Sequence, residues 1–249
     1  MINNAENVFE TAFAAGDSGY IRTHAPAYIS SCITHSVPCH VHMLITSNDP
    51  DSDIEFVNRL IKAADQLNRT GQHVSCTYSL ADDCHKHRSY YSTMRFELAE
   101  TLLKNTQLKR ILITDIDSFF MKSFEWPTKP IGLYLRESLP GTNYWEALGT
   151  RVAAGIVYCD KSKVDFLTKT NAKISKYQKN YDWFIDQVAL FETSVTENQE
   201  DIHVFGQETM DWEFQDNSVM WTGKGDRKHN SERYLEAKHL YENKFFQSW

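Results

Sequence analysis

The first half of the chain alternates between short strand-like segments and longer segments with helical periodicity, and this alternation constrains the fold more than any other feature. Between Ile54 and Leu67 the apolar residues recur at helical spacing, whereas residues 111–114 form a short continuous apolar run. Such a run is typical of a central parallel strand that is buried on both faces. The strands expected in this half are residues 7–14, 40–46, 73–80 and 111–114, and the helices are residues 20–35, 54–67 and 89–104. This order predicts an α/β fold in which right-handed crossovers build a parallel sheet.

The second half of the chain is less regular. Residues 205–228 are rich in Trp, Gly and charged residues, and we expect loops there. The strands expected in this half are residues 131–135 and 153–159, and the helices are residues 162–177, 181–193 and 232–245. No linker or repeat divides the 249 residues. We therefore expect one Rossmann-like domain over residues 1–249, with a mostly parallel central sheet flanked by helices.

Charge and composition limit the partners of the chain. Its net charge of −7 argues against a dedicated nucleic-acid-binding protein, because such proteins carry basic surfaces. No run of about 18 apolar residues occurs, so no transmembrane helix is expected. The N-terminal sequence lacks the basic and apolar regions of a signal peptide, and the five cysteines have no regular spacing. We therefore expect a cytoplasmic protein with reduced thiols.

Two carboxylates, Asp115 and Asp117, follow the apolar run directly. Residues two apart in an extended chain place their side chains on the same face. Carboxylates so close together repel each other unless a cation lies beside them. Oxygen ligands of this kind suit Mg²⁺ or Mn²⁺, which keep open positions for the phosphates of a substrate. Because parallel sheets bind ligands at the carboxyl ends of their strands, this segment is the leading candidate for a functional site.

This segment resembles the DxD motif of nucleotide-sugar glycosyltransferases with the GT-A fold, in particular the glycogenin and bacterial galactosyltransferase relatives. The resemblance continues along the chain in the right order. Residues 153–157 are similar to the Asn-Ala-Gly-hydrophobic strand of these families, and Asp186-Gln187 to their Asp-Gln helix. Residues 221–228 are similar to the glycine- and lysine-containing loop that closes over the diphosphate. The resemblance implies a single GT-A domain.

Within that domain, the resemblance implies a nucleotide-binding half (residues 1–120) and an acceptor-binding half (residues 121–249). It also implies a divalent metal, Mn²⁺ or Mg²⁺, between the DxD carboxylates and the diphosphate of the donor. Asp117 corresponds to the firmer metal ligand, and Asp115 to a ligand of the metal or of the ribose. The metal would stabilise the negative charge that develops on the departing nucleoside diphosphate.

The third metal ligand departs from the family pattern. The related families place a histidine two or three residues before the loop glycine, but this sequence has Met220 and Trp221 there. His229, just after the loop, is the substitute that we expect.

The resemblance implies that the donor is a nucleotide sugar, such as a UDP-sugar or a GDP-sugar. Tyr20 follows the first strand and is expected to stack on the base. Tyr91 and Arg95 lie on the helix before the DxD motif, and the loop supplies positive charge and glycines that let backbone N–H groups approach phosphates. The residues expected to bind the nucleotide and its phosphates are Tyr20, Tyr91, Arg95, Gly223, Lys224 and Lys228.

Asp186 and Gln187 correspond to residues near the anomeric carbon and are expected to take part in catalysis. We favour retention of the anomeric configuration, because this pair resembles the retaining relatives. An inverting enzyme needs a carboxylate base, for which Glu208 or Asp211 is available. The acceptor is a carbohydrate or another hydroxyl compound. The residues expected to contact the sugar or acceptor are Ala154, Gly155, Trp212 and Trp221.

Two alternatives remain open at this point. A haloacid-dehalogenase-like phosphohydrolase also has a D-x-D motif after an apolar strand, and there Asp115 would attack phosphorus while Asp117 acts as acid and base. A non-catalytic module that binds a sugar or a nucleotide on a decayed transferase fold is the second alternative. The absent histidine and the alanine at position 153 in place of the family's asparagine motivate it.

Overall fold

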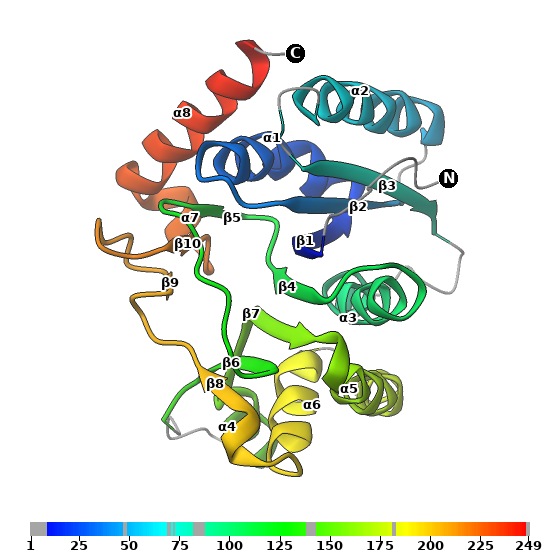
Figure 1. Ribbon diagram of the computed structural model, residues 1–249, viewed down its shortest axis with the longest axis vertical. Coiled ribbons are helices and arrows are strands. Elements are labelled where there is room, and N and C mark those ends of the chain that lie inside the picture. Colours follow the sequence, from blue (N-terminus) through cyan, green and yellow to red (C-terminus); the bar gives the residue numbers. More distant parts are fainter. Residues whose placement is uncertain are drawn as a thin grey trace.

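The computed structural model describes residues 9–46, 49–68, 71, 73–81, 88–137, 143–180 and 183–247. Within them, a seven-stranded sheet forms the centre of an α/β fold, with helices on both of its faces (Figure 1). From one edge to the other the strands are β3 (Val74–Leu80), β2 (Cys39–Ile45), β1 (Glu10–Asp17), β4 (Arg110–Thr114), β7 (Val152–Asp160), β6 (Ile131–Leu135) and β8 (Ile202–Val204). The expected α/β class and the mostly parallel sheet are thus confirmed.

The directions of the strands bring the functional segments to one edge of this sheet. Strands β1 to β4 run parallel, β7 runs antiparallel to both β4 and β6, and β8 runs parallel to β6. Thr114 at the end of β4 pairs with Ile156 of β7, and Leu135 at the end of β6 pairs with Val152. The carboxyl ends of β1, β4 and β6 therefore lie beside the amino end of β7.

Alternate side chains of the central strands face two separate cores. In β1, Ala12 and Ala14 pack in the core under α1 and α2, while Phe13 and Ala15 pack on the opposite face, under α3, α5 and α6. Burial on both faces explains the apolar runs that predicted these strands. The helices are α1 (Ser18–Thr34), α2 (Pro50–Asn68), α3 (Arg88–Asn105), α4 (Tyr144–Gly149), α5 (Val164–Tyr177), α6 (Ile185–Ser194), α7 (Arg227–Asn230) and α8 (Glu232–Gln247), with short 3₁₀ turns η2 (Lys161–Lys163) and η3 (Gln199–Asp201). Across the described ranges, none of the helices has the length and apolar character needed to cross a membrane.

A second, three-stranded sheet joins the DxD segment to the C-terminal part of the chain. Its strands, in spatial order, are β5 (Ser118–Phe120), β10 (Met220–Thr222) and β9 (Met210–Asp211). β5 begins directly after Asp117, and Ser118 pairs with Thr222 in an antiparallel register. This pairing holds Gly223, the first residue after β10, beside the DxD carboxylates.

The boundaries of three predicted segments need correction. The first strand continues to Asp17, while residues 7 and 8 lie outside the described part of the chain. The helix expected from residue 181 begins at Ile185, because Phe184 has a left-handed φ of 63° that α-helical backbone does not adopt. Residues 205–228, expected to form loops, contain β9 and β10, which are too short to show a periodicity in the sequence.

Candidate active site

Asp115 and Asp117 lie at the carboxyl end of β4, on either side of Ile116, which packs in the core. The Asp115 N–H donates to the Gly155 carbonyl of β7 at 3.4 Å. Burial raises the pKa of Asp115, and the charge of nearby Asp117 adds to the increase. The charges of the two carboxylates therefore influence each other at the carboxyl end of β4.

Arg95 of α3 neutralises the charge of Asp115. Its side chain is only 7% exposed, and its guanidinium donates to Asp115 Oδ1 through Nη1. Nη2 of Arg95 donates to the Ala154 carbonyl at 3.0 Å and to Asp186 Oδ2 at 3.3 Å. Arg95 thus connects α3, β4, β7 and α6, and its expected contact with a nucleotide remains a prediction. These contacts position the carboxylates of Asp115 and Asp186.

Asp117 has a different set of partners, drawn from both ends of the chain. Its Oδ2 accepts hydrogen bonds from the Tyr20 hydroxyl at 2.7 Å and from Lys228 Nζ at 3.0 Å. Lys228 also contacts the Tyr20 hydroxyl and lies 4.8 Å from the centroid of its ring. Burial, followed by the Asp117 charge, raises the pKa of Tyr20 far above its ordinary value. Tyr20, which was expected to stack on a base, is thus held as a hydrogen-bond donor to the DxD motif.

The backbone of Asp117 anchors the C-terminal loop. Its carbonyl accepts a hydrogen bond from the Tyr234 hydroxyl of α8 at 2.5 Å and another from the Gly223 N–H at 3.1 Å. The loop from Gly223 to Lys228 therefore lies against the DxD motif. Tyr234 has no counterpart in the sequence-based site, because the helical pattern of α8 identified it only as an apolar residue.

Two glycines allow the backbone to approach the carboxylates closely. A Cβ atom on Gly155 would lie 2.8 Å from Asp115 Oδ2. A Cβ atom on Gly223 would lie 2.8 Å from the Tyr234 hydroxyl and 3.1 Å from Asp117 Oδ2. Side-chain carbons do not fit at these distances. Gly155 and Gly223 are therefore needed for the geometry of the DxD motif, whichever ligand binds there.

The carboxylates can accommodate a divalent metal. Asp115 Oδ2 and Asp117 Oδ1 accept no hydrogen bond from any described residue, so each carboxylate keeps one oxygen available. His229 is exposed on α7. In the parts of the chain that are described, no three His, Cys, Asp or Glu side chains gather into a metal site. The expected role of His229 as a third ligand remains a prediction, and without His229 the oxygens of a substrate would complete the shell.

Asp186 and Gln187 lie in the first turn of α6, next to the Asp115 cluster. Asp186 is bound by Arg95, and burial raises its pKa. Gln187 Oε1 accepts a hydrogen bond from Arg136 Nη2 at 3.0 Å. Arg136, directly after β6, also donates to the Val152 carbonyl at 2.9 Å. Arg136 is not among the site residues expected from the sequence, although a basic residue at the carboxyl end of a predicted strand is a signal for such a position.

The tryptophans expected around the sugar have different environments. Trp221 is 2% exposed and packs with Phe119 and Phe214, and its Nε1 donates to the Gln215 carbonyl at 2.8 Å. It is a core residue in this structure, and its expected contact with a sugar remains a prediction. Trp212 is only partly buried, and Lys224 Nζ lies 4.5 Å from the centroid of its ring.

The remaining residues expected at the site also have different environments. Ala154 is buried, and its carbonyl is bound by Arg95. Tyr91 lies within α3, but its side chain is outside what the structure describes. Lys224 and Lys228 were both expected at the diphosphate, yet Lys228 contacts Asp117 while Lys224 lies over Trp212. The two lysines of the loop from Gly223 to Lys228 therefore contact different parts of the site.

One of the two bases considered for an inverting reaction is excluded by its surroundings. Asp211 is fully buried, and its carboxylate accepts four hydrogen bonds. Burial alone would raise the pKa of Asp211, but these hydrogen bonds outweigh burial and lower it. Such a carboxylate stabilises its own loop and is unavailable to take a proton from an acceptor. Glu208 is exposed and remains available.

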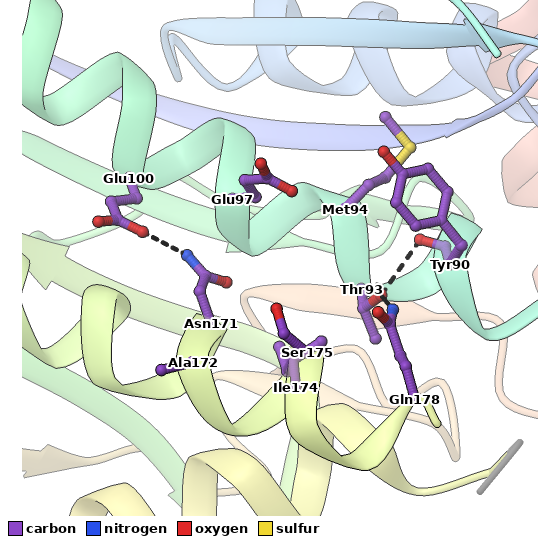
Figure 2. A pocket seen from close by; sticks show the side chains of 10 residues that line it. All are labelled: Tyr90, Thr93, Met94, Glu97, Glu100, Asn171, Ala172, Ile174, Ser175 and Gln178. Carbon is purple, nitrogen blue, oxygen red and sulfur yellow. Dashed lines mark hydrogen bonds between the residues drawn. The ribbon is translucent and has the colours of Figure 1, made fainter. Parts of the chain in front are cut away.

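A groove of about 230 Å³ lies between α3 and α5 and is separate from the carboxylates (Figure 2). Its walls include Glu97 and Glu100 on one helix and Asn171 on the other, and Asn171 Nδ2 donates to Glu100 Oε2 at 2.6 Å. None of the residues expected at the functional site lines it. The groove therefore plays no part in the site.

The fold and the paired carboxylates place the chain among α/β proteins that bind ligands at the carboxyl edge of a sheet. The sequence matches no family model and no curated protein. Solved structures do match in fold. One is the glycosyltransferase GlyE of Streptococcus pneumoniae TIGR4, with a TM-score of 0.57 and 12% identity over 96% of this chain and 64% of the other.

A second match is the bifunctional glycosyltransferase WbbM in its apo form, with a TM-score of 0.59 and 13% identity over 99% of this chain and 53% of the other. The chain therefore has the fold of known glycosyltransferases. It spans less than two thirds of the length of either matched structure.

Proposed function

We propose that this chain is a metal-dependent glycosyltransferase that moves a hexose from a nucleotide sugar to a hydroxyl acceptor. The observation that carries the proposal is the pair Asp115 and Asp117, held at the carboxyl edge of a glycosyltransferase fold with one oxygen of each left available. The likeness in fold to glycosyltransferases favours this function over a phosphohydrolase.

The metal, Mn²⁺ or Mg²⁺, would be held by Asp115 Oδ2 and Asp117 Oδ1. When bound, it supplies a Lewis acid beside the phosphates of the leaving group. Hard cations of this kind are commonly held by one or two carboxylates together with substrate phosphates, so a two-carboxylate site is sufficient.

Lys228 and Tyr20 provide the second source of charge stabilisation. The Lys228 ammonium that pairs with Asp117 can pair instead with the diphosphate oxygens, and the Tyr20 hydroxyl keeps its proton and remains a donor. Both groups lie beside the Asp117 carboxylate before the donor binds, which favours stabilisation of the charge that develops on the leaving group.

Gln187 is proposed to orient the transferred sugar, with its side-chain amide fixed by Arg136. Retention of the anomeric configuration remains our preference. The hydrogen bonds of buried Asp211 support retention, because they remove this carboxylate from the two candidate bases and leave only the exposed Glu208. The anomeric configuration of the product, read by NMR, distinguishes the two outcomes.

The first experiment is calorimetric titration of UDP and GDP, with and without Mn²⁺, into the wild-type protein and Asp117→Asn. We expect one nucleotide to bind at least about tenfold more tightly with Mn²⁺, a difference of ~1.4 kcal/mol, and the substitution to remove this gain. Asp65→Asn, on the exposed surface of α2, is the matched control and keeps the gain. Equal affinity with and without Mn²⁺ in the wild-type protein would contradict the proposal.

A further inference from the structure

Lys224 and Arg227 lie beside Trp212, and Arg136 lies near enough for its charge to act on Lys224. Lys224 Nζ lies over the Trp212 ring, and Arg227 Nη1 approaches the Trp212 carbonyl at 3.5 Å. Arg136 donates only to a carbonyl and to the Gln187 amide oxygen, and its buried Nε has no hydrogen-bond partner within the described ranges. No ion pair joins Lys224, Arg136 or Arg227 to a carboxylate among the residues that the structure describes.

The other two cations of the site differ in this respect. Arg95 is paired with Asp115 and Asp186, and Lys228 is paired with Asp117. In a chain with a net charge of −7, three cations that form no ion pair with a described carboxylate are a distinct local feature, although the charges of Glu208, Asp211 and Glu213 reach Tyr134 beside Trp212. Burial, followed by the charges of Arg136 and Arg227, lowers the pKa of Lys224, which is the effect expected from cations that lie close together. An anion bound among them would relieve this repulsion.

The same surface has a face suited to a sugar ring. The rings of Trp212 and Tyr134 lie with their centroids 5.4 Å apart and their planes tilted by 50°, and Trp212 is partly exposed. Arg136 is hydrogen-bonded to Gln187, the residue proposed to orient the transferred sugar. The cations therefore lie on the sugar side of the site and not at Asp117, where Lys228 is the available partner for the diphosphate.

We propose that Arg136, Lys224 and the ring of Trp212 form a binding site for an anionic carbohydrate, a sugar that carries a carboxylate or a phosphate group. A guanidinium and an ammonium together provide charge-assisted hydrogen bonds to such a group, and the indole covers the apolar face of its ring. This inference rests on the proposed function, because it names the class of substrate for the same site. The anionic sugar is either the acceptor or the transferred sugar of the donor.

The test compares matched sugars that differ in charge. The first pair is glucose 6-phosphate and glucose, titrated without nucleotide and then with UDP and Mn²⁺ present. The second pair is UDP-glucuronic acid and UDP-glucose. We expect the anionic member of at least one pair to bind about tenfold more tightly, a ratio that corresponds to ~1.4 kcal/mol. A preference in the first pair assigns the anion to the acceptor, and a preference in the second assigns it to the donor.

The variants Lys224→Gln and Arg136→Gln are expected to reduce this preference to about twofold or less, since each removes one charge-assisted hydrogen bond. Lys62→Gln, which removes an exposed charge from α2, keeps it. The absence of a preference in both pairs would overturn the inference. An equal loss of affinity for UDP and for the anionic sugar in Lys224→Gln would also overturn it, because Lys224 would then belong to the diphosphate site. The titration without nucleotide remains informative even where UDP fails to bind, so the two proposals can fail separately.

Discussion

Acidification is expected to destabilise the fold through two buried histidines of β2. His40 Nδ1 and Nε2 bond the hydroxyls of Ser75 and Thr77 on β3 at 2.7 and 2.9 Å, and His42 bonds Thr77 and Ser79 at 2.8 and 3.0 Å. Burial, together with the neighbouring His42, lowers the pKa of His40 to about 3, and burial lowers that of His42 to about 4. Both side chains therefore remain neutral in the native state well below pH 6.

The sign of the effect follows from linkage. In the unfolded chain a histidine has a pKa of about 6.5, so below that pH the unfolded state binds protons that the native state does not. The contribution of the two histidines to the free energy of unfolding is therefore fully present above about pH 6.5. It decreases as the pH falls toward their native pKa values. Between pH 7.5 and pH 5.0 each histidine lowers the free energy of unfolding by about 2 kcal/mol, and the two together by about 4 kcal/mol.

Urea titration followed by tryptophan fluorescence at the two pH values measures this difference. The double variant His40→Asn/His42→Gln is expected to be less stable at pH 7.5, because it loses hydrogen bonds and packing, but to lose about 4 kcal/mol less on acidification. The control His239→Gln replaces a histidine whose side chain is 73% exposed on α8 and should leave the pH dependence unchanged. A double variant that loses as much stability as the wild-type protein between the two pH values would refute the reasoning.

Two further predictions concern the site. Arg95→Met removes a buried cation from Asp115 and Asp186 and should lower the free energy of unfolding by about 3–5 kcal/mol. The exposed Arg59→Met, which breaks an i,i+4 pair with Glu55, should cost less than about 1 kcal/mol. Equal urea midpoints for these two variants would contradict the positioning role of Arg95. Trp221→Ala should destabilise the fold by about 3–5 kcal/mol because its ring is in the core. Trp212→Ala should lower the urea midpoint less than Trp221→Ala, because its ring is only partly buried against the core, and it should weaken the binding of sugars. A larger loss of stability in Trp212→Ala than in Trp221→Ala would show that the two rings have been assigned wrongly.

The central sheet could be predicted because its strands are buried on both faces. Residues 111–114 and 131–135 form apolar runs in the sequence, and both are strands with nearly these bounds. The position of Asp115 and Asp117 followed from the same pattern, since the end of a buried strand in a parallel sheet is a point where ligands bind. The location of the candidate site was thus available from local sequence alone.

The partners of the site residues could not be predicted in this way. Arg95 and Asp186 are 91 residues apart, and their contact depends on how α3 and α6 pack against the same strands. Trp212 and Trp221 belong to one loop-rich segment, and only the tertiary packing decides that Trp212 is partly exposed and Trp221 is buried. The strands β5, β9 and β10 have two or three residues each, so pairing between distant segments forms them, and their own sequence does not.

The pairing of β5 with β10 has a consequence for the order in which the protein can mature. Lys228 is synthesised 111 residues after Asp117, and Tyr234 later still. A nascent chain that has emerged only as far as β7 holds an uncompensated Asp117 and lacks the strand that pairs with β5. A fragment of residues 1–120 therefore lacks both the lysine that pairs with Asp117 and the strand that pairs with β5, although Arg95 already pairs with Asp115 within it.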